Sequence, residues 1–350
     1  MRRPDPSFWR GRPVLLTGHT GFKGGWTALM LDALGARVTG LALDPEPGLS
    51  AHDALGGAAR LDRDLRRDIR ATGAIGDAVP EGGVVLHLAA QAIVGRGHRD
   101  PSGTWSANLD GTRTLLDAAA GMPIAAAVIV TSDKVYRQTG ARRPFVEADA
   151  LGGEDPYSAS KAACELLVAS YRKAGRITVP IATARAGNVI GGGDLGEDRL
   201  IPDLVRAMAA GQSLRLRHPD ATRPFQHVLD VICGYLLLAE TLASGPAPEA
   251  VNFGPAEAET RVRDLLDLWA RATGTAIDWA QDAAPAYPEQ PRLALDSSLA
   301  CTALGWAPLM SVGMAAAETA CWYRDRLAGR DMAKISRDTI QTYLHGDLIA

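Results

Sequence analysis

The sequence predicts an α/β fold, a Rossmann-type doubly wound parallel sheet with a smaller C-terminal α+β region. Short apolar runs alternate with longer helical patterns in the first half, and strands joined by helices in this way pair in parallel through right-handed crossovers. A glycine-rich turn joins the first apolar run to the first helical pattern. Beyond about Arg185, glycine turns, mixed helices and brief strands replace the alternation. We therefore expect one domain over residues 1–185 and a second region over residues 186–350, with the chain crossing between them.

The expected elements follow in chain order. Residues 13–17 form a compact apolar run typical of a buried strand, and residues 23–34 place apolar side chains at helical spacing. Gly35 stands where a glycine commonly ends a helix. The remaining expected elements are strands over residues 37–43, 84–88, 125–131, 179–184 and, in the second region, 251–253, and helices over residues 103–120 and 157–173.

Composition and charge exclude several classes of function. The 37 basic and 40 acidic residues leave a formal net charge of −3, so we expect no nucleic-acid partner. The two N-terminal arginines precede no apolar segment, and the longest apolar stretch, residues 124–130, is too short to span a bilayer. The four cysteines are scattered, and neither they nor the histidines have metal-ligand spacing. We expect a cytoplasmic protein with reduced thiols, no metal and no membrane partner.

The turn after the first expected strand carries a glycine pattern. Residues 17–24 read Thr-Gly-His-Thr-Gly-Phe-Lys-Gly, which spaces Gly18, Gly21 and Gly24 at every third position. Such glycines allow a tight turn, close approach of backbone to a pyrophosphate, and close packing of helix on sheet. The helix expected from Lys23 onward then presents free N–H groups to the phosphates. The pattern predicts a dinucleotide site; the alternative is an ordinary strand–turn–helix junction.

Further residues extend the predicted dinucleotide site. Asp44 follows the second expected strand, where an acid would bond the adenosine ribose and disfavour a 2′-phosphate, which favours NAD; otherwise it is a solvated turn acid. Asp68 and Ile69, at the end of the presumed third strand, are placed to bracket the adenine. His19 and Lys23 lie close to the predicted pyrophosphate path unless they point to solvent.

A tyrosine and a lysine begin one expected helix. Tyr157 and Lys161 stand at i and i+4, on one helix face, and an ammonium near a phenol lowers its pKa. The phenolate could then take a proton from a sugar hydroxyl whose carbon gives hydride to nicotinamide. Ser132 ends the preceding strand and could hold the same oxygen. The order of Ser132, Tyr157 and Lys161 predicts an oxidoreductive site.

With these residues the chain resembles the extended short-chain dehydrogenases/reductases and, more narrowly, their CDP-glucose 4,6-dehydratase branch. Asp133, Lys134 and residues 186–194 carry the narrower resemblance. The matching segments run over nearly the whole chain and are residues 18–24, 87–91, 131–134, 151–153, 155–158, 185–194, 198–202, 223–224, 226–228 and 304–306.

The resemblance implies an activity. Such enzymes hold NAD beside a nucleotide-linked glucose, oxidise C4, lose water across C5 and C6, and return the hydride to C6. The product would be CDP-4-keto-6-deoxyglucose. Asp133 is the implied acid for the C6 hydroxyl, provided that burial raises its pKa. Lys134 stands where related dehydratases carry a glutamate base; it acts as the C5 base, stabilises the enolate, or is a solvated lysine.

The resemblance also implies binding residues. Residues 1–185 would bind NAD and residues 186–350 the nucleotide sugar. For the substrate diphosphate, arginine suits phosphate geometry, although one of the candidates is expected to be an ordinary surface residue. Asn252 is expected in a turn. Leu88, Ala89 and Ala90 join the cofactor site, and the substrate candidates are Gln91, His98, Asn188, Arg199, Arg223 and, more weakly, Arg292.

The chain departs from the branch in three segments: residues 49–51, residues 95–98 (Gly-Arg-Gly-His) and residues 138–144. The last two border the expected sugar pocket, so the sugar and the base stay open; His98 replaces a tyrosine contact or lies at the rim. Two other functions remain: a nucleotide-sugar 4-epimerase, which would not need Asp133 and Lys134, and a non-catalytic dinucleotide-dependent regulator. A homodimer is expected through helices near residues 112–120 and 162–171.

Overall fold

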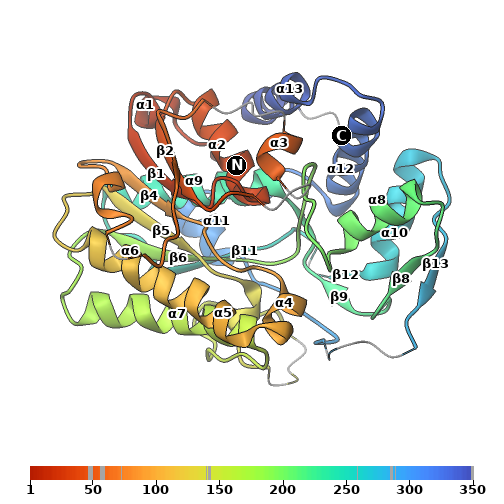
Figure 1. The fold of residues 1–350 in the computed structure, drawn as a ribbon, viewed down its shortest axis with the longest axis horizontal. Coiled ribbons are helices and arrows are strands. Elements are labelled where there is room, and N and C mark those ends of the chain that lie inside the picture. Colours follow the sequence, from red (N-terminus) through yellow and green to blue (C-terminus); the bar gives the residue numbers. More distant parts are fainter. Residues whose placement is uncertain are drawn as a thin grey trace.

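A computed structural model describes residues 1–45, 50–55, 60–71, 73–138, 140, 143–257, 259–283, 287 and 289–347. The sheet and its helices form the larger part of the molecule, and a smaller part lies beside them (Figure 1). Residues 49, 139, 141 and 142, which belong to two of the departing segments, lie outside the described residues.

The larger part is built on a seven-stranded sheet whose neighbouring strands all run parallel. This arrangement confirms the predicted fold class. The strands are, in sheet order, β11 (Ala250–Phe253), β6 (Ile181–Ala186), β5 (Ala126–Val130), β4 (Val84–His87), β1 (Pro13–Thr17), β2 (Arg37–Ala42) and β3 (Arg63–Arg66).

The strand at residues 250–253 corrects one expectation. We expected residues 251–253 in the second region and Asn252 in a turn, but β11 is the edge strand of the main sheet and pairs with β6. Asn252 is fully buried, and its side chain accepts a hydrogen bond from the Tyr136 hydroxyl (2.6 Å). A short apolar run shows that a strand forms but not which strand it joins, because the partner is set by tertiary packing.

Helices cover both faces of the sheet, as a doubly wound fold requires. One hydrophobic core lies between the sheet and the side of α6 and α7, and a larger one extends over α2 and α9 on the opposite face (Figure 1). The helices of this part are α1 (Pro6–Trp9), α2 (Phe22–Ala33), α3 (Ala51–Ala54), α4 (Val94–Arg99), α5 (Pro101–Trp105), α6 (Gly111–Ala119), α7 (Pro156–Lys173), α9 (Val228–Ser244), α11 (Ser298–Leu304) and α13 (Met332–His345), with 3₁₀ turns at Gly76–Ala78 and Asp133–Val135.

The helix expected over residues 103–120 is interrupted. A π-helical turn, Ser106–Asp110, separates α5 from α6. The Asn108 side chain in this turn accepts a hydrogen bond from the Gln91 backbone N–H (2.8 Å) and donates one to the Ser160 hydroxyl (2.8 Å). The π turn therefore ties the loop after β4 to α7, close to where Tyr157 begins that helix.

The described residues of the smaller part form three two-stranded sheets, whose strands are short, and three helices. It is assembled from chain that follows β6, and α9, β11 and α11 return to the sheet between its segments. Its elements are β7 (Val189–Ile190), α8 (Leu200–Ala209), β8 (Leu214–Leu216), β9 (Thr222–Arg223), β10 (Gln226–His227), β12 (Thr260–Arg261), α10 (Val262–Thr273), β13 (Trp279–Gln281) and α12 (Val312–Leu327).

Within the described ranges, no helix is both long enough and apolar enough to cross a bilayer. Among the same residues, no three histidine, cysteine or acidic side chains gather where they could hold a metal ion.

Candidate functional site

A cavity of about 280 Å³ lies where the strand ends of the sheet meet the smaller part. Both parts contribute to its walls, so residues far apart in the sequence face one space. The predicted site residues that line it are Phe22, Lys23, Ser132, Asp133, Lys134, Tyr157, Asn188, Arg199 and Arg223.

The glycine loop has the shape that a pyrophosphate requires. Gly18 has a φ of +78°, and a Cβ there would lie 2.7 Å from the Ala89 nitrogen. A Cβ on Gly24 would lie 2.0 Å from the Gly18 oxygen, so both positions need glycine for close packing. Gly21 begins α2 without a side-chain cap, and a Cβ there would meet nothing closer than 3.4 Å. The first N–H groups of α2 are thus left for an anion, which fits the diphosphate of a dinucleotide.

The other predicted cofactor residues near the glycine loop differ in burial. His19 is fully buried, not solvent-facing: its ring fills the space over Gly40, and its Nε2 lies 3.0 Å from Asp64 Oδ1. Burial lowers the pKa of His19, although Asp64 opposes the shift. The Asp44 side chain is 85% exposed, and its nearest ion-pair partner is Arg66 at 3.9 Å.

Other cofactor candidates lie at the ends of β3 and β4. Asp68 binds Arg70, and the neighbouring Ile69 is buried against Gly111. The Thr17 hydroxyl accepts hydrogen bonds from the N–H groups of Leu88 (3.2 Å) and Ala89 (3.1 Å), which fixes the turn that continues to Ala90.

Tyr157 is positioned by the start of α7. Asp155 caps this helix by accepting from the backbone N–H groups of Tyr157 (2.9 Å) and Ser158 (3.0 Å). Pro156 occupies the first helical position, which its fixed φ favours. Tyr157 thereby lines the cavity together with Ser132, which acts to lower the pKa of the phenol.

The protonation of Tyr157 corrects another expectation. Burial raises the pKa of Tyr157 to about 12, while the Ser132 hydrogen bond and the charge of Arg199 act in the opposite direction. The predicted lowering by Lys161 is therefore wrong for this structure, because desolvation of the phenolate outweighs the attraction of nearby cations. Lys161 Nζ instead donates to the Val130 carbonyl (3.0 Å), and burial lowers its pKa.

Asp133 is a buried acid beside the phenol. It lies in the 3₁₀ turn after β5, is 3% exposed, and accepts a hydrogen bond from the Ser132 hydroxyl at Oδ1 (3.1 Å). Among the described residues its Oδ2 has no hydrogen-bond partner, and a Cβ on Gly187 would lie 2.4 Å from that atom. Burial raises the pKa of Asp133, so the carboxyl holds its proton to higher pH than a solvated aspartate and can donate it. Lys134 follows in the same turn and lines the cavity.

Two of the candidate arginines enter the cavity and one does not. Arg199 is paired with Asp194 (2.9 Å), and Arg223, which is 4% exposed, with Glu289 (3.0 Å). Arg292 does not line the cavity, because its guanidinium is held by Glu259.

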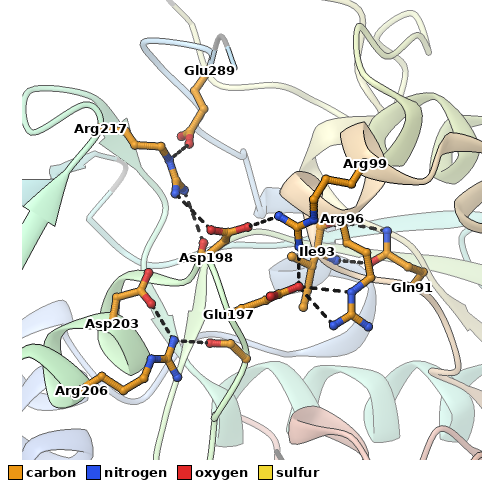
Figure 2. A network of polar contacts seen from close by, with 11 residues as sticks. Gln91, Ile93, Arg96, Arg99, Glu197, Asp198, Asp203, Arg206, Arg217 and Glu289 are labelled. Atoms are coloured by element: carbon orange, nitrogen blue, oxygen red, sulfur yellow. Dashed lines mark hydrogen bonds and ion pairs between the residues drawn. The ribbon is translucent and has the colours of Figure 1, made fainter. Parts of the chain in front are cut away.

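A network of ion pairs lies at the cavity mouth (Figure 2). Arg96 and Arg99 of α4 bind Glu197 (3.1 and 2.6 Å), which belongs to the smaller part. Arg217 binds Glu289 (2.8 Å) and lies 3.8 Å from Asp198. Sequence reasoning missed the network residues Glu197, Asp198, Arg217 and Glu289, because surface charges carry no signal of pairing across such a distance in sequence.

The departing segment 95–98 takes part in this contact. A Cβ on Gly95 would lie 2.2 Å from Asp198 Oδ2, so the glycine admits the carboxylate. His98 stacks on Tyr287, with ring centres 4.8 Å apart. Gln91 does not line the cavity; its side chain binds Thr104 (2.8 Å).

Comparison with known proteins agrees with this geometry. The CDP-glucose 4,6-dehydratase of Salmonella typhimurium is 35% identical over 97% of this chain and 98% of its own length. The crystal structure of the dTDP-glucose 4,6-dehydratase of Streptomyces venezuelae, solved with NAD bound, is 25% identical, with a TM-score of 0.77 over 92% of this chain and 99% of that one. The UDP-glucose 4-epimerase of Stenotrophomonas maltophila shares the fold at 21% identity, with a TM-score of 0.79 over 91% of this chain and 100% of that one.

The family is shown by a separate match. The family described as the NAD dependent epimerase/dehydratase family matches residues 14–254, which contain the glycine loop, Ser132, Tyr157 and β11. With this match, and with the relative that is similar over nearly its whole length, the chain belongs to the NAD-dependent epimerase/dehydratase family.

Proposed function

We propose that the protein is a nucleotide-sugar 4,6-dehydratase that uses NAD to convert CDP-glucose to CDP-4-keto-6-deoxyglucose. The observation that carries the proposal is Asp133, a buried carboxyl in the same cavity as Ser132 and Tyr157, whose Oδ2 meets no hydrogen-bond partner in the part of the chain that the structure describes. A 4-epimerase has no use for a proton donor there, whereas loss of the C6 hydroxyl requires one, because hydroxide is a poor leaving group. The similar dehydratase from Salmonella typhimurium supports CDP-glucose as the substrate.

Three residues at the cavity take part in the oxidation of C4. NAD, held by the glycine loop and the start of α2, would supply reversible hydride transfer. Tyr157 accepts the C4 hydroxyl proton, and Ser132, which touches the phenol, holds the same sugar oxygen. Lys161 lies behind them and donates to the Val130 carbonyl, whereas Ser132 and the charge of Arg199 are the influences that favour phenolate. The resulting C4 ketone makes the neighbouring C5 proton removable.

Asp133 and Lys134 serve the elimination. Asp133 donates its proton to the C6 hydroxyl as the C–O bond breaks, which releases water. Lys134 lines the same cavity, and we assign its amine to the C5 proton: the amine accepts that proton as the enolate forms, and the resulting ammonium stabilises the negative charge of the enolate.

The binding roles follow the two parts of the molecule. Residues 1–185 would hold NAD through the glycine loop and the ends of the strands, and residues 186–350 would hold the nucleotide sugar. Asn188, Arg199 and Arg223 reach the cavity and would bind the substrate diphosphate. His98 and Gln91, which do not line it, would act at its rim or through the loops that they hold.

A homodimer in the cytoplasm is a further part of the proposal. The exposed side of α7 carries Leu166, which is 60% exposed, and Trp105 of α5 is 37% exposed. Two such surfaces, paired across a two-fold axis, would bury these side chains. Sedimentation should give twice the chain mass of 36.9 kDa; a monomer at micromolar concentration would contradict the dimer.

One reaction tests the activity. The protein is incubated with NAD and CDP-glucose in deuterated water, and the sugar nucleotide is analysed by mass and NMR. Loss of one water with solvent deuterium at C5 supports the dehydratase. An unchanged mass with a galacto-configured product would instead identify a 4-epimerase. Binding of NAD with no turnover across CDP-, UDP- and dTDP-sugars would identify a regulator.

A further inference from the structure

Gly187 lies against the carboxyl of Asp133. It directly follows β6 and lines the cavity. A Cβ at this position would lie 2.4 Å from Asp133 Oδ2 and 2.9 Å from Asp133 Cγ. The same point lies 2.6 Å from Pro224 Cγ. The carboxyl therefore occupies the space that a side chain on Gly187 would fill, next to the proline ring. We call this space, beside Gly187 and Pro224, the carboxyl pocket.

The glycine at position 187 is not explained by its backbone. The φ of Gly187 does not lie in the left-handed region that favours glycine. What excludes a side chain there is the close approach of Asp133 and Pro224. The residue type at this position is therefore tied to the carboxyl that lies against it.

The backbone at Gly187 is held on two sides. Its carbonyl accepts a hydrogen bond from the side-chain N–H of Gln226 (3.3 Å), which is 1% exposed. The same Gln226 nitrogen donates to the Phe253 carbonyl of β11 (2.7 Å), and the Gln226 backbone N–H donates to the Asn188 carbonyl (3.3 Å). These bonds tie the loop after β6 to β10 and to the main sheet. A side chain on Gly187 would therefore displace the carboxyl, which can rotate, before it displaced the backbone.

The charged groups that face Asp133 do not explain its buried state. Lys134 of the same turn and Arg223 of β9 favour the carboxylate, but burial outweighs them and raises the pKa of Asp133. Lys23 of α2 and Tyr157 of α7 face the carboxyl as well. Within the described residues, none of these groups donates a hydrogen bond to Oδ2. The proton of Asp133 thus depends on the exclusion of water around that oxygen.

We propose that Gly187 positions the proton donor: its missing side chain leaves the carboxyl pocket open, and the Asp133 carboxyl is held there against backbone and proline ring. The inference rests on the proposed function, because it takes Asp133 as the acid for the C6 hydroxyl. Gly187 acts through Asp133 and is a positioning residue. A carboxyl turned out of the pocket would lose its direction toward the substrate and its shelter from water.

Gly187→Ala fills the carboxyl pocket with a methyl group. Turnover of CDP-glucose should fall about 10- to 100-fold, a smaller loss than removal of the acid gives. Oxidation at C4 should continue while water loss slows, so reduced nicotinamide should accumulate in a single turnover and be seen by its absorbance. The matched control is Gly76→Ala, at an exposed glycine whose Cβ would meet no atom within 4 Å, and it should leave turnover unchanged.

The titration of Asp133 is a readout that needs neither cofactor nor substrate. NMR of the full chain with isotope-labelled aspartate carboxyl carbons follows the signal that is missing in Asp133→Asn. In Gly187→Ala the displaced carboxyl is better solvated, so the pKa of Asp133 should fall by about one pH unit. Because the proton is then lost at lower pH, the alkaline decline of turnover should move to lower pH as well. Pro224→Ala, which removes the ring on the other side, should lower the same pKa and serves as the test if Gly187→Ala does not fold.

A double substitution shows whether Gly187 acts through Asp133. Asp133→Ala leaves no carboxyl to displace, so adding Gly187→Ala should lower turnover by about twofold at most. A further loss as large as the one in wild-type protein would overturn the positioning role. An unchanged titration of Asp133 in Gly187→Ala, or in Pro224→Ala where the former does not fold, would also overturn it and leave the dehydratase proposal intact. Wild-type protein that removes no water from CDP-glucose would overturn the proposed function, and with it the role of Asp133 as donor, even if the titration shifts as expected.

Discussion

A buried ion pair between Glu165 and Arg185 lies beside the end of β5, and a substitution of Glu165 can test how much the pair stabilises the fold. The Glu165 carboxylate accepts hydrogen bonds from the hydroxyls of Thr131 (2.5 Å) and Thr183 (2.6 Å) and from the Arg185 guanidinium (2.8 and 3.0 Å). The side chains of Glu165 and Arg185 are 3% and 5% exposed. Because Thr131 directly precedes Ser132, this cluster fixes the end of β5 from which the reacting residues emerge.

The change Glu165→Gln removes the charge and keeps the shape. Loss of one partner of a buried pair costs about 3–5 kcal/mol, because the other charge stays buried without compensation. Arg185 keeps the Tyr136 hydroxyl (2.9 Å) and the Glu147 carbonyl (3.0 Å) as acceptors, so we expect the lower end, about 3 kcal/mol. With an m-value of about 3 kcal/mol per molar urea, the unfolding midpoint should fall by about 1 M.

Urea unfolding followed by circular dichroism measures the shift. The matched control is Asp338→Asn, which removes a carboxylate from the exposed pair with Lys334 and should leave the midpoint unchanged. A loss below about 1 kcal/mol for Glu165→Gln would refute the reasoning, since an uncompensated buried guanidinium cannot cost so little. Replacing both partners, Glu165→Met with Arg185→Leu, should recover part of the loss because no charge is then left buried.

Three further predictions concern the reaction. Tyr157→Phe should lower turnover about 10²–10⁴-fold while NAD still binds, measured by product mass and by calorimetry; near-normal turnover would remove Tyr157 from its role. Asp133→Asn should slow water loss by a similar factor. Burial raises the pKa of Asp133, so its carboxyl carries the proton below that pKa and loses it above. Wild-type turnover should therefore decline on the alkaline side of the pH profile. The same alkaline decline in Asp133→Asn would contradict the assignment. Gly95→Ala would bring a methyl group to 2.2 Å from Asp198 Oδ2 and should raise the KM for the nucleotide sugar several-fold with kcat little changed; an unaltered KM would show that the mouth network does not affect substrate binding.

The sequence predicted those features that local order determines. Apolar runs located β1, β4 and β5, and the helical pattern over residues 157–173 located α7, which begins one residue earlier at Pro156. The protonation of Tyr157 was mispredicted because burial comes from walls supplied by chain beyond residue 186, which no local pattern reveals. Arg292 resembled Arg223 in sequence, yet Glu259 holds one outside the cavity and Glu289 holds the other within it. Which carboxylate meets which arginine is decided by the fold.

The departing segment 95–98 connects both ends of the reaction site. A Cβ on Gly97 would lie 3.3 Å from the Tyr157 nitrogen, and one on Gly95 would clash with Asp198, next to Arg199. One face of α4 therefore lies against the start of the helix that carries the phenol, and another against the loop that carries a phosphate-binding candidate. A methyl group at Gly95 would displace the Asp198 carboxylate, and one at Gly97 would press on the backbone nitrogen of Tyr157. The unusual residues of this segment are thus explained by close approach between the two parts of the molecule, and substrate affinity should respond to them before the chemistry does.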